Sequence, residues 1–276
     1  MVTQVMTPPV LEIRGVGKTY VSARTGDAIE ALVGIDLEVR RGEFLAIVGP
    51  SGCGKSTLLS LIAGFISPSK GEVRFKGVPV AGPAPERGVM FQDYALFPWR
   101  TVTGNVEFGP LARGVALGER QRRARELIRL VGLEGFENRY PHELSGGMRQ
   151  RCALARMLAN DPELWLMDEP LAAVDQQTRI ILQDELLRLW GDTQSHATTA
   201  TASVVLVTHA IDEAVFLADR IVVLARRPGR VKAIVDVPLP RPRAAVRASS
   251  EFAALVEHVW GLIRDEAVQA ITEEVS

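Results

Sequence analysis

A short apolar run that leads into a glycine-rich segment constrains the fold of this chain more than any other feature. Residues 44–48 read Phe-Leu-Ala-Ile-Val, which is typical of a strand buried on both faces of a parallel sheet. Helical spacing of apolar residues then extends from Lys55 to Ala63 and is closed by Gly64. The sequence therefore predicts a strand, a glycine loop and a helix, which together form one unit of an α/β fold.

The segment between the strand and the helix predicts a phosphate-binding site. It has the spacing GxxxxGK[ST] and consists of Gly49, Pro50, Ser51, Gly52, Cys53, Gly54, Lys55, Ser56 and Thr57. Glycines let backbone N–H groups curl around phosphate oxygens, and the helix directs its positive N-terminus at them. We expect Lys55 to contact the β- and γ-phosphates and the Ser56 hydroxyl to ligate Mg²⁺. A chance glycine turn is the alternative, and the flanking strand and helix disfavour it.

A second apolar strand, predicted at residues 164–167, ends in two acids, Asp168 and Glu169. Ligands of open α/β sheets bind beyond the carboxyl ends of the strands. We therefore expect Asp168 near the metal and Glu169 beside the γ-phosphate, as a general base for water. Taken alone, the segment could equally be two solvated acids in a turn.

Residues 144–150, which read Leu-Ser-Gly-Gly-Met-Arg-Gln, predict a second anion site. Ser145 is a good N-cap for the helix that follows, and Gly146 and Gly147 expose backbone N–H groups of its first turn. No second phosphate ligand is obvious for this site. The alternative is a well-capped helix that happens to carry glycines.

The hydrophobic periodicity of the rest of the chain predicts the fold in which these motifs lie. Residues 11–39 have strand-like alternation, whereas residues 119–131 and 146–159 have helical periodicity. We predict a parallel-sheet α/β core with an N-terminal antiparallel β subdomain and a helical subdomain inserted at about residues 94–160. Residues 191–202 are expected to form a surface loop.

Composition excludes several classes of protein. With 32 basic and 33 acidic side chains the net charge is −1, so the chain lacks the basic surplus of a nucleic-acid binder. Two cysteines, Cys53 and Cys152, are too few for a disulfide framework or a zinc site. No stretch approaches the roughly 20 apolar residues of a membrane-spanning helix, and residues 1–10 do not read as a secretory signal. We expect any membrane role to come through a partner.

The motifs occur in the order found in the ATP-binding subunits of ABC transporters, which the chain resembles over residues 11–235. The segment at 144–150 is the specific part, because other phosphate-loop ATPases lack it. The resemblance implies a RecA-like phosphate-loop ATPase domain over residues 1–235, with ATP and Mg²⁺ as cofactors. It also implies a head-to-tail dimer, of two copies or with a similar ATPase subunit. In that dimer each phosphate loop faces the partner's signature residues, Ser145, Gly146, Gly147 and Met148.

The resemblance also suggests roles for further residues. Tyr20 is similar to the aromatic residue that stacks on adenine, with an ordinary strand aromatic as the alternative. Gln92 is similar to the residue that contacts Mg²⁺ and the attacking water, and His209 to the histidine that contacts the γ-phosphate. Asp175 matches a residue that makes a contact across the dimer, although residues 170–174 depart from the sequence usual in the importer group described next.

The sequence of residues 86–102 resembles the corresponding segment in the ATPase subunits of bacterial importers of nitrate, sulfonates, taurine and related solutes. That resemblance implies an apolar patch of Leu96, Phe97, Pro98 and Trp99 on which a membrane permease docks; alternatively, these residues simply pack the helical subdomain. It also implies a solute-binding protein acting through the permease, and a peripheral location on the cytoplasmic face of the inner membrane. An exporter subunit and a soluble non-transport ABC protein remain alternatives, whereas a small-molecule kinase leaves residues 144–150 unexplained.

Two further expectations concern the end of the chain and Cys53. Residues 236–276 are expected to form a solvated Pro/Arg-rich linker followed by an amphipathic helix from Glu251 to about Ala270. Because Cys53 lies in the phosphate loop at a helix N-terminus, its thiolate is expected to be favoured. Maleimide would then modify it and block ATP binding.

Overall fold

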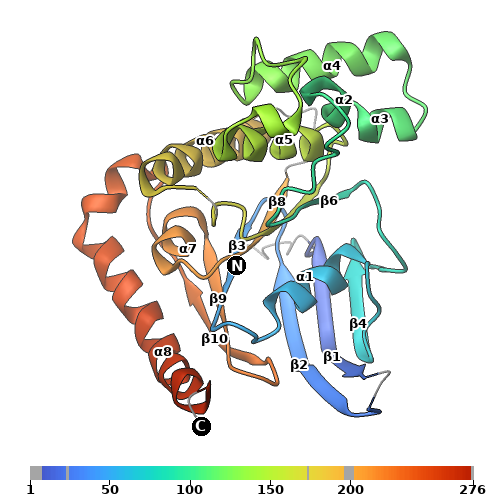
Figure 1. Cartoon of the computed structure of the whole chain (residues 1–276). Helices are drawn as coiled ribbons and strands as arrows, with labels where there is room; N and C mark the ends of the chain where they lie inside the picture. The colour runs from blue at the N-terminus through green and yellow to red at the C-terminus, as the bar shows by residue number, and fades with distance from the viewer. Residues whose placement is uncertain (1–7, 23–24, 173, 196–201, 275–276) are drawn as a thin grey trace, which may run out of the picture. The chain divides into compact units, whose positions relative to one another are not determined.

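The computed structural model describes residues 8–22, 25–172, 174–195 and 202–274 (Figure 1). Contacts divide the chain into two compact units. The first unit comprises residues 1–83 and 183–276, and the second comprises residues 84–182.

An antiparallel sheet forms one part of the first unit. Its strands are β1 (Leu11–Val21), β2 (Ala28–Val39), β4 (Lys70–Phe75) and β5 (Val78–Pro79), in the order β2-β1-β4-β5. Every neighbouring pair is antiparallel. Leu11 and Ile13 alternate with less buried neighbours along β1, as period-two patterning requires. The predicted N-terminal antiparallel β region is confirmed.

Buried parallel strands form the centre of the same unit. Strand β3 (Phe44–Val48) lies between β8 (Ser203–Val207) and β9 (Arg220–Leu224) and is parallel to both. Strand β10 (Val231–Asp236) pairs with β9 in the antiparallel sense. Every residue of β3 and β8 is buried, which explains their continuous apolar runs. Helix α1 (Lys55–Ala63) follows β3, and α7 (Ile211–Leu217) follows β8. The predicted α/β core is confirmed.

The second unit combines a parallel strand pair with helices. Strands β6 (Arg87–Met90) and β7 (Leu164–Asp168) pair in parallel. The helices between them are α2 (Val102–Val106), α3 (Phe108–Ala112), α4 (Leu117–Leu130) and α5 (Gly146–Leu158), with the short 3₁₀ turn η1 (Pro141–Glu143) before α5. Helix α4 buries Ala124, Leu127 and Ile128 and keeps the exposed ion pair Arg122–Glu126 outside. Its charged face is the outer face of an amphipathic helix.

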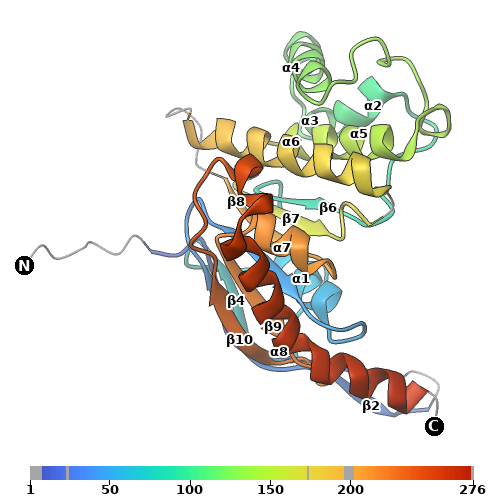
Figure 2. The ribbon, with the colours of Figure 1, turned by 90° about the vertical axis from the view of Figure 1, so that its left-hand side faces the viewer.

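The C-terminal segment has the helix predicted from Glu251 to about Ala270, but the linker before it differs from its prediction. The segment folds into the 3₁₀ turn η2 (Arg243–Ala248) and helix α8 (Ser250–Glu274), and Figure 2 shows α8 in front of β9 and β10. Arg243 is only 2% exposed, so a solvated linker is the wrong description of residues 238–247. No helix among the described residues is long and apolar enough to cross a membrane.

Helix α6 (Gln176–Ser195) extends into the segment that was predicted to be a surface loop. The loop predicted at residues 191–202 is wrong as far as Ser195, because the helix continues to that residue. Residues 196–201 lie outside the part of the chain that the structure describes.

Candidate functional site

The phosphate loop connects β3 to α1 in the first unit. Gly54 is the N-cap of α1, and no side chain accepts a hydrogen bond at this cap. The first backbone N–H groups of α1 therefore have no side-chain partner, which is the arrangement that binds anions at a helix N-terminus. Gly54 has φ 95°, and a Cβ there would lie 2.6 Å from Leu32 Cδ2. Both the backbone conformation and the close contact require glycine.

Lys55 is held across this loop. Its Nζ donates to the carbonyl oxygens of Gly49, at 2.8 Å, and Pro50, at 3.0 Å. The side chain is 7% exposed, although Ser56 beside it is exposed at the start of α1. The ammonium group is thus fixed over the segment whose N–H groups are predicted to bind phosphate. Contact of Lys55 with the β- and γ-phosphates stays a prediction.

Cys53 belongs to the phosphate loop, but its side chain turns into the core. Its side chain is fully buried, and burial raises the pKa of its thiol. The prediction that the thiolate is favoured is therefore wrong. Desolvation outweighs the influence of Lys55, whose Nζ lies 3.9 Å from Sγ.

This environment predicts that native Cys53 resists maleimide. Burial also raises the pKa of Cys152, to about 12, and both cysteines are free and buried. Since the thiolate is the reactive form, a raised pKa lowers its fraction at any given pH. We expect negligible labelling of the native chain at mildly alkaline pH, with or without ATP, and complete labelling in concentrated guanidinium chloride, followed by mass spectrometry. Rapid native labelling of Cys53 would contradict the buried geometry.

His209 lies at the same edge of the sheet as the phosphate loop. Strands β3 and β8 are parallel, with Ile47 opposite Val207, so the residues after both strands emerge side by side. Thr208 donates its backbone N–H to the Ile47 carbonyl at 3.2 Å. His209 itself is exposed. The structure brings this predicted residue to the carboxyl ends of the strands, where ligands of α/β sheets bind.

Tyr20 projects from the antiparallel sheet of the first unit. It is opposite Ile29 on β2 and 43% exposed. The Lys18 ammonium lies 5.3 Å from the centre of its ring. An exposed aromatic face of this kind can stack on a planar ring, so the adenine role stays a prediction.

In the second unit, the parallel pairing of β6 and β7 brings three of the predicted site residues together. Met90 is opposite Met167, so Gln92 and the two acids Asp168 and Glu169 follow adjacent strand ends. Glu169 has φ 46°, in the left-handed region that non-glycine residues rarely adopt. Such strain persists where the surrounding structure holds a residue in a functional orientation.

The signature segment and Asp175 also lie together in this unit. Ser145 caps α5, and its Oγ accepts from the Met148 N–H at 3.3 Å. A Cβ on Gly147 would lie 3.3 Å from Thr178 Cγ2. Asp175 in turn accepts from the backbone N–H of Thr178 at 3.0 Å, and this bond lowers the pKa of its carboxyl. The predicted cap is confirmed, and an ionised Asp175 lies next to the first turn of α5.

A model of the ABC transporter family matches residues 32–172 of the chain. The chain belongs to this family. It is the ATP-binding subunit of an ABC transporter and an ATPase.

Relatives support this assignment at high similarity. An ABC transporter ATP-binding protein of Methanocaldococcus jannaschii is 51% identical over 246 residues, which are 89% of each chain. The taurine import ATP-binding protein of Roseobacter denitrificans is 41% identical over 245 residues, 87% of this chain and 89% of its own. The protein of the same name from Yersinia pseudotuberculosis is 43% identical over 239 residues, 84% and 91% of the two chains.

Solved structures agree with the fold. A dimeric ATP-binding cassette in a post-hydrolysis state, bound to ADP and Pi, has a TM-score of 0.71 at 32% identity and covers 83% of this chain and all of its own. The cbiO1 protein of Clostridium perfringens, part of the ABC transporter complex cbiONQ, has a TM-score of 0.72 at 25% identity. It covers 91% of this chain and 96% of its own.

In this ABC ATPase the structure adds a residue that sequence reasoning missed. Tyr94 and Ala95, just after Gln92, have φ 62° and 45°, two consecutive left-handed residues that are not glycine. Arg156 of α5 donates to both of their carbonyls, at 2.7 Å to Tyr94. Its guanidinium also lies 5.5 Å from the ring centre of Phe97. Arg156 therefore holds a strained segment of the site to the helix that carries the signature.

Replacing Arg156 by glutamine is expected to destabilise this unit. The change removes two hydrogen bonds from a charged donor that support strained backbone, so the free energy of unfolding should fall by about 2 kcal/mol. Arg122→Gln is the matched control, because it removes an exposed ion pair worth less than about 0.5 kcal/mol. Urea unfolding measures both, and equal stability of the two variants would show that the Arg156 contacts contribute nothing.

Proposed function

We propose that this chain is the ATPase subunit of an importer that takes up taurine, a sulfonate, nitrate or a similar solute through a membrane permease. Two relatives that cover most of the chain are named taurine import ATP-binding proteins. In this proposal a solute-binding protein delivers the solute to the permease. The subunit acts as a peripheral protein on the cytoplasmic face of the membrane, and ATP binding and hydrolysis supply the driving force.

The observation that carries the importer proposal is the exposed ring of Trp99 in the second unit, within the predicted patch of Leu96, Phe97, Pro98 and Trp99. Trp99 is 71% exposed, and Phe97 packs against both Trp99 and Phe108, at 5.7 and 4.4 Å between ring centres. Phe97 is thus a packing residue, whereas Trp99 offers its ring to a partner. Tryptophan is enriched at protein interfaces. This patch follows Gln92 closely, so a docked permease would act directly on the segment that holds Gln92.

We assign each residue a role in hydrolysis that suits the chemistry of its side chain. The phosphate loop from Gly49 to Thr57 and Lys55 bind the triphosphate, and Tyr20 stacks on adenine. Glu169 accepts a proton from the attacking water, which Gln92 orients, and His209 donates a hydrogen bond to the γ-phosphate. Catalysis then rests on positioning and on stabilising charge at the phosphoryl group.

The donor set in this proposal suits Mg²⁺. Ser56, Gln92 and Asp168 offer a hydroxyl, an amide and one carboxylate, all hard oxygen ligands. No group of three or more His, Cys, Asp or Glu residues among the described residues could hold a metal by itself. The phosphates and water would therefore supply the remaining ligands, as is usual for Mg²⁺. Bound there, the ion would neutralise charge on the β- and γ-phosphates.

The proposed assembly is a head-to-tail dimer. The signature residues Ser145, Gly146, Gly147 and Met148 form a capped helix start, which would bind the γ-phosphate held by the partner's phosphate loop. Asp175, kept ionised beside this helix, would make a contact across the dimer. We further propose residues 1–235 as the ATP-binding domain, with the helical subdomain at about 94–160 and residues 236–276 as its C-terminal appendage.

Taurine uptake tests the importer proposal. Cells that lack the gene are complemented with the natural chain, with Trp99→Ala or with Trp260→Ala, which removes an exposed tryptophan of α8. We expect Trp99→Ala to reduce uptake of labelled taurine, alkanesulfonate or nitrate at least tenfold, while ATPase activity of the purified chain stays within twofold. Trp260→Ala should match the natural chain in both assays.

Three outcomes would contradict the proposal in different parts. Unchanged uptake in Trp99→Ala would show that the permease does not dock on this patch. Loss of efflux in place of uptake would favour an exporter. Full ATPase activity together with purification of soluble partners only, from membranes solubilised in mild detergent, would favour a non-transport ABC protein.

A further inference from the structure

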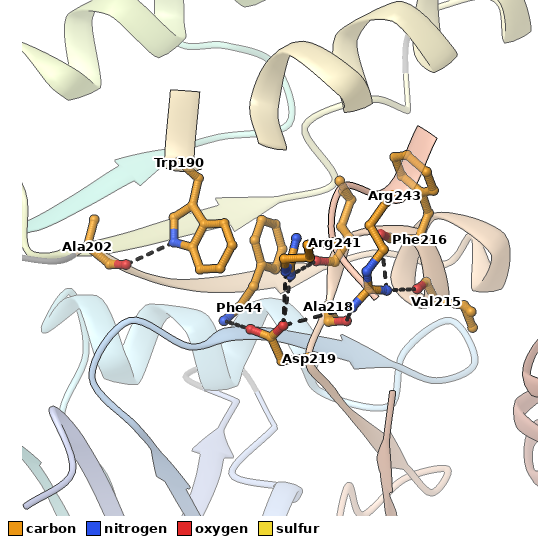
Figure 3. A network of polar contacts seen from close by, with 10 residues as sticks. Phe44, Trp190, Ala202, Val215, Phe216, Ala218, Asp219, Arg241 and Arg243 are labelled. Atoms are coloured by element: carbon orange, nitrogen blue, oxygen red, sulfur yellow. Dashed lines mark hydrogen bonds and ion pairs between the residues drawn. The ribbon is translucent and has the colours of Figure 1, made fainter. Parts of the chain in front are cut away.

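The last carbonyl groups of α7 are bound by two arginines from the C-terminal segment (Figure 3). Arg243 donates through Nη1 to the Val215 carbonyl at 2.9 Å and through Nη2 to the Ala218 carbonyl at 3.0 Å. Arg241 donates to the Leu217 carbonyl at 2.9 Å. The final carbonyls of any helix lack partners within the helix. Here the side chains of residues 241 and 243, which we call the arginine clamp, supply these partners.

Arg243 is built into the interior and does not lie on the surface. The residue is 2% exposed, and burial lowers the pKa of its guanidinium to about 10. The Asp219 carboxylate lies 3.9 Å from Arg243 and 2.8 Å from Arg241. Burying a charge is unfavourable unless hydrogen bonds and an opposite charge compensate for it. The clamp provides both, so its geometry is fixed.

Asp219 connects the clamp to the strand that leads into the phosphate loop. Its Oδ2 accepts from the Phe44 N–H at 2.9 Å, and its own N–H donates to the Phe44 carbonyl at 2.7 Å. Phe44 is the first residue of β3, and β3 ends directly before Gly49. Arg241 also stacks on Trp190 of α6, 4.5 Å from its ring centre. The clamp therefore contacts α6, α7 and the start of β3 together.

The opposite end of α7 follows His209. Ala210 donates its backbone N–H to Thr208 Oγ1 at 3.0 Å, and the Thr208 hydroxyl bonds to the Glu213 carboxylate of α7. Helix α7 has seven residues and is thus about 10 Å long. A shift of so short a helix at its C-terminus moves its N-terminus by a similar amount.

We propose that Arg241 and Arg243 are positioning residues for ATP hydrolysis, which hold α7 and hence His209 in register with β3 and the phosphate loop. The proposal rests on the role of His209 proposed above. It assigns to the C-terminal segment a part in the ATPase reaction, although this segment carries none of the family's motifs. A displacement of His209 by about 1 Å would reduce kcat by up to about 100-fold. It would leave ATP affinity nearly unchanged, because the phosphate loop keeps its own contacts.

The test is a double-mutant cycle on the full chain. The variants are Arg243→Lys, Arg241→Gln, His209→Ala and each arginine change combined with His209→Ala, with Arg125→Gln of α4 as a control for loss of a surface arginine. We measure kcat and KM for ATP, the Kd for ATP without turnover, and the urea midpoint. We expect kcat to fall 10- to 100-fold in the single arginine variants, with Kd within twofold.

The His209→Ala background separates positioning from stability. If the clamp acts through His209, the arginine changes should alter kcat less than twofold in that background. Equal losses in both backgrounds, or losses of kcat and affinity in parallel with the urea midpoint, would overturn the proposal. Full activity of His209→Ala would instead contradict the role of His209 itself. If Arg243→Lys fails to fold, Arg241→Gln still tests the proposal, because the Arg241 side chain is 30% exposed and that of Arg243 only 1%.

Discussion

Glu169→Gln is expected to bind ATP normally and to lose turnover almost completely. Glutamine has the size of glutamate and can occupy the same strained backbone position, φ 46°, after β7. It cannot accept a proton from the attacking water. Loss of a general base lowers a rate by about 10²- to 10⁴-fold. Because bound ATP would persist, the variant should also remain a dimer in ATP. The natural chain would hydrolyse its ATP, and its dimer would open.

ATPase assays and gel filtration with ATP and Mg²⁺ measure these two effects. Glu163→Gln is the matched control, since Glu163 precedes β7 and thus lies at the opposite end of the same strand. Its kcat should stay within twofold of the natural value. A Glu169→Gln chain that hydrolyses ATP at the natural rate would contradict the general-base assignment. Loss of ATP binding would show that Glu169 shapes the site and does not act as the base.

The second large effect is expected for Gly229→Ala, in the turn between β9 and β10. A Cβ at this position would lie 2.0 Å from the carbonyl oxygen of Cys53 in the phosphate loop. The turn cannot simply move away, because Gly229 donates to Ala31 and accepts from Val33, both at 2.9 Å. Either the turn or the phosphate loop must shift. Overpacking of this kind lowers the free energy of unfolding by about 1–3 kcal/mol.

A shifted phosphate loop would misalign the N–H groups that bind ATP. We expect at least a tenfold weaker Kd, equivalent to about 1.4 kcal/mol, measured by calorimetry. Gly82→Ala is the control, because a Cβ on Gly82 would meet no heavy atom within 4 Å. Natural ATP affinity in Gly229→Ala would mean that the turn can yield without disturbing the loop.

The sequence predicted those parts of the fold that depend on local patterns. The apolar run of β3, the helix α1 and the Ser145 cap each follow from residues within one element, and the structure confirms them. The parallel pairing of β6 with β7 agrees with the predicted parallel-sheet core, since parallel strands need a long connection and a helical segment lies between these two. The α/β architecture was thus predictable from periodicity and glycine placement.

The contacts that depend on tertiary packing were not predictable in this way. Cys53 has the expected position at a helix N-terminus, yet its side chain turns into the core, where desolvation decides its pKa. Residues 238–247 have the composition of a solvated linker, but composition does not show that α7 ends with carbonyls that need donors. In the sequence Arg156 is one of several arginines on an amphipathic helix. Its hydrogen bonds to the strained residues Tyr94 and Ala95 appear only in the folded structure.

The arginine clamp also changes where this cassette can be cut or recombined. The family match covers residues 32–172, and a fragment ending at residue 235 would still contain every motif. Such a fragment would leave the α7 carbonyls without donors and expose Phe216, which now lies beneath Arg247. Although residues 1–235 carry the motifs of the proposed ATP-binding domain, we therefore expect the smallest fragment that folds by itself to extend at least through Arg247. In chimeras between related ATPases, α7 and the segment around Arg241 and Arg243 should be exchanged as one piece.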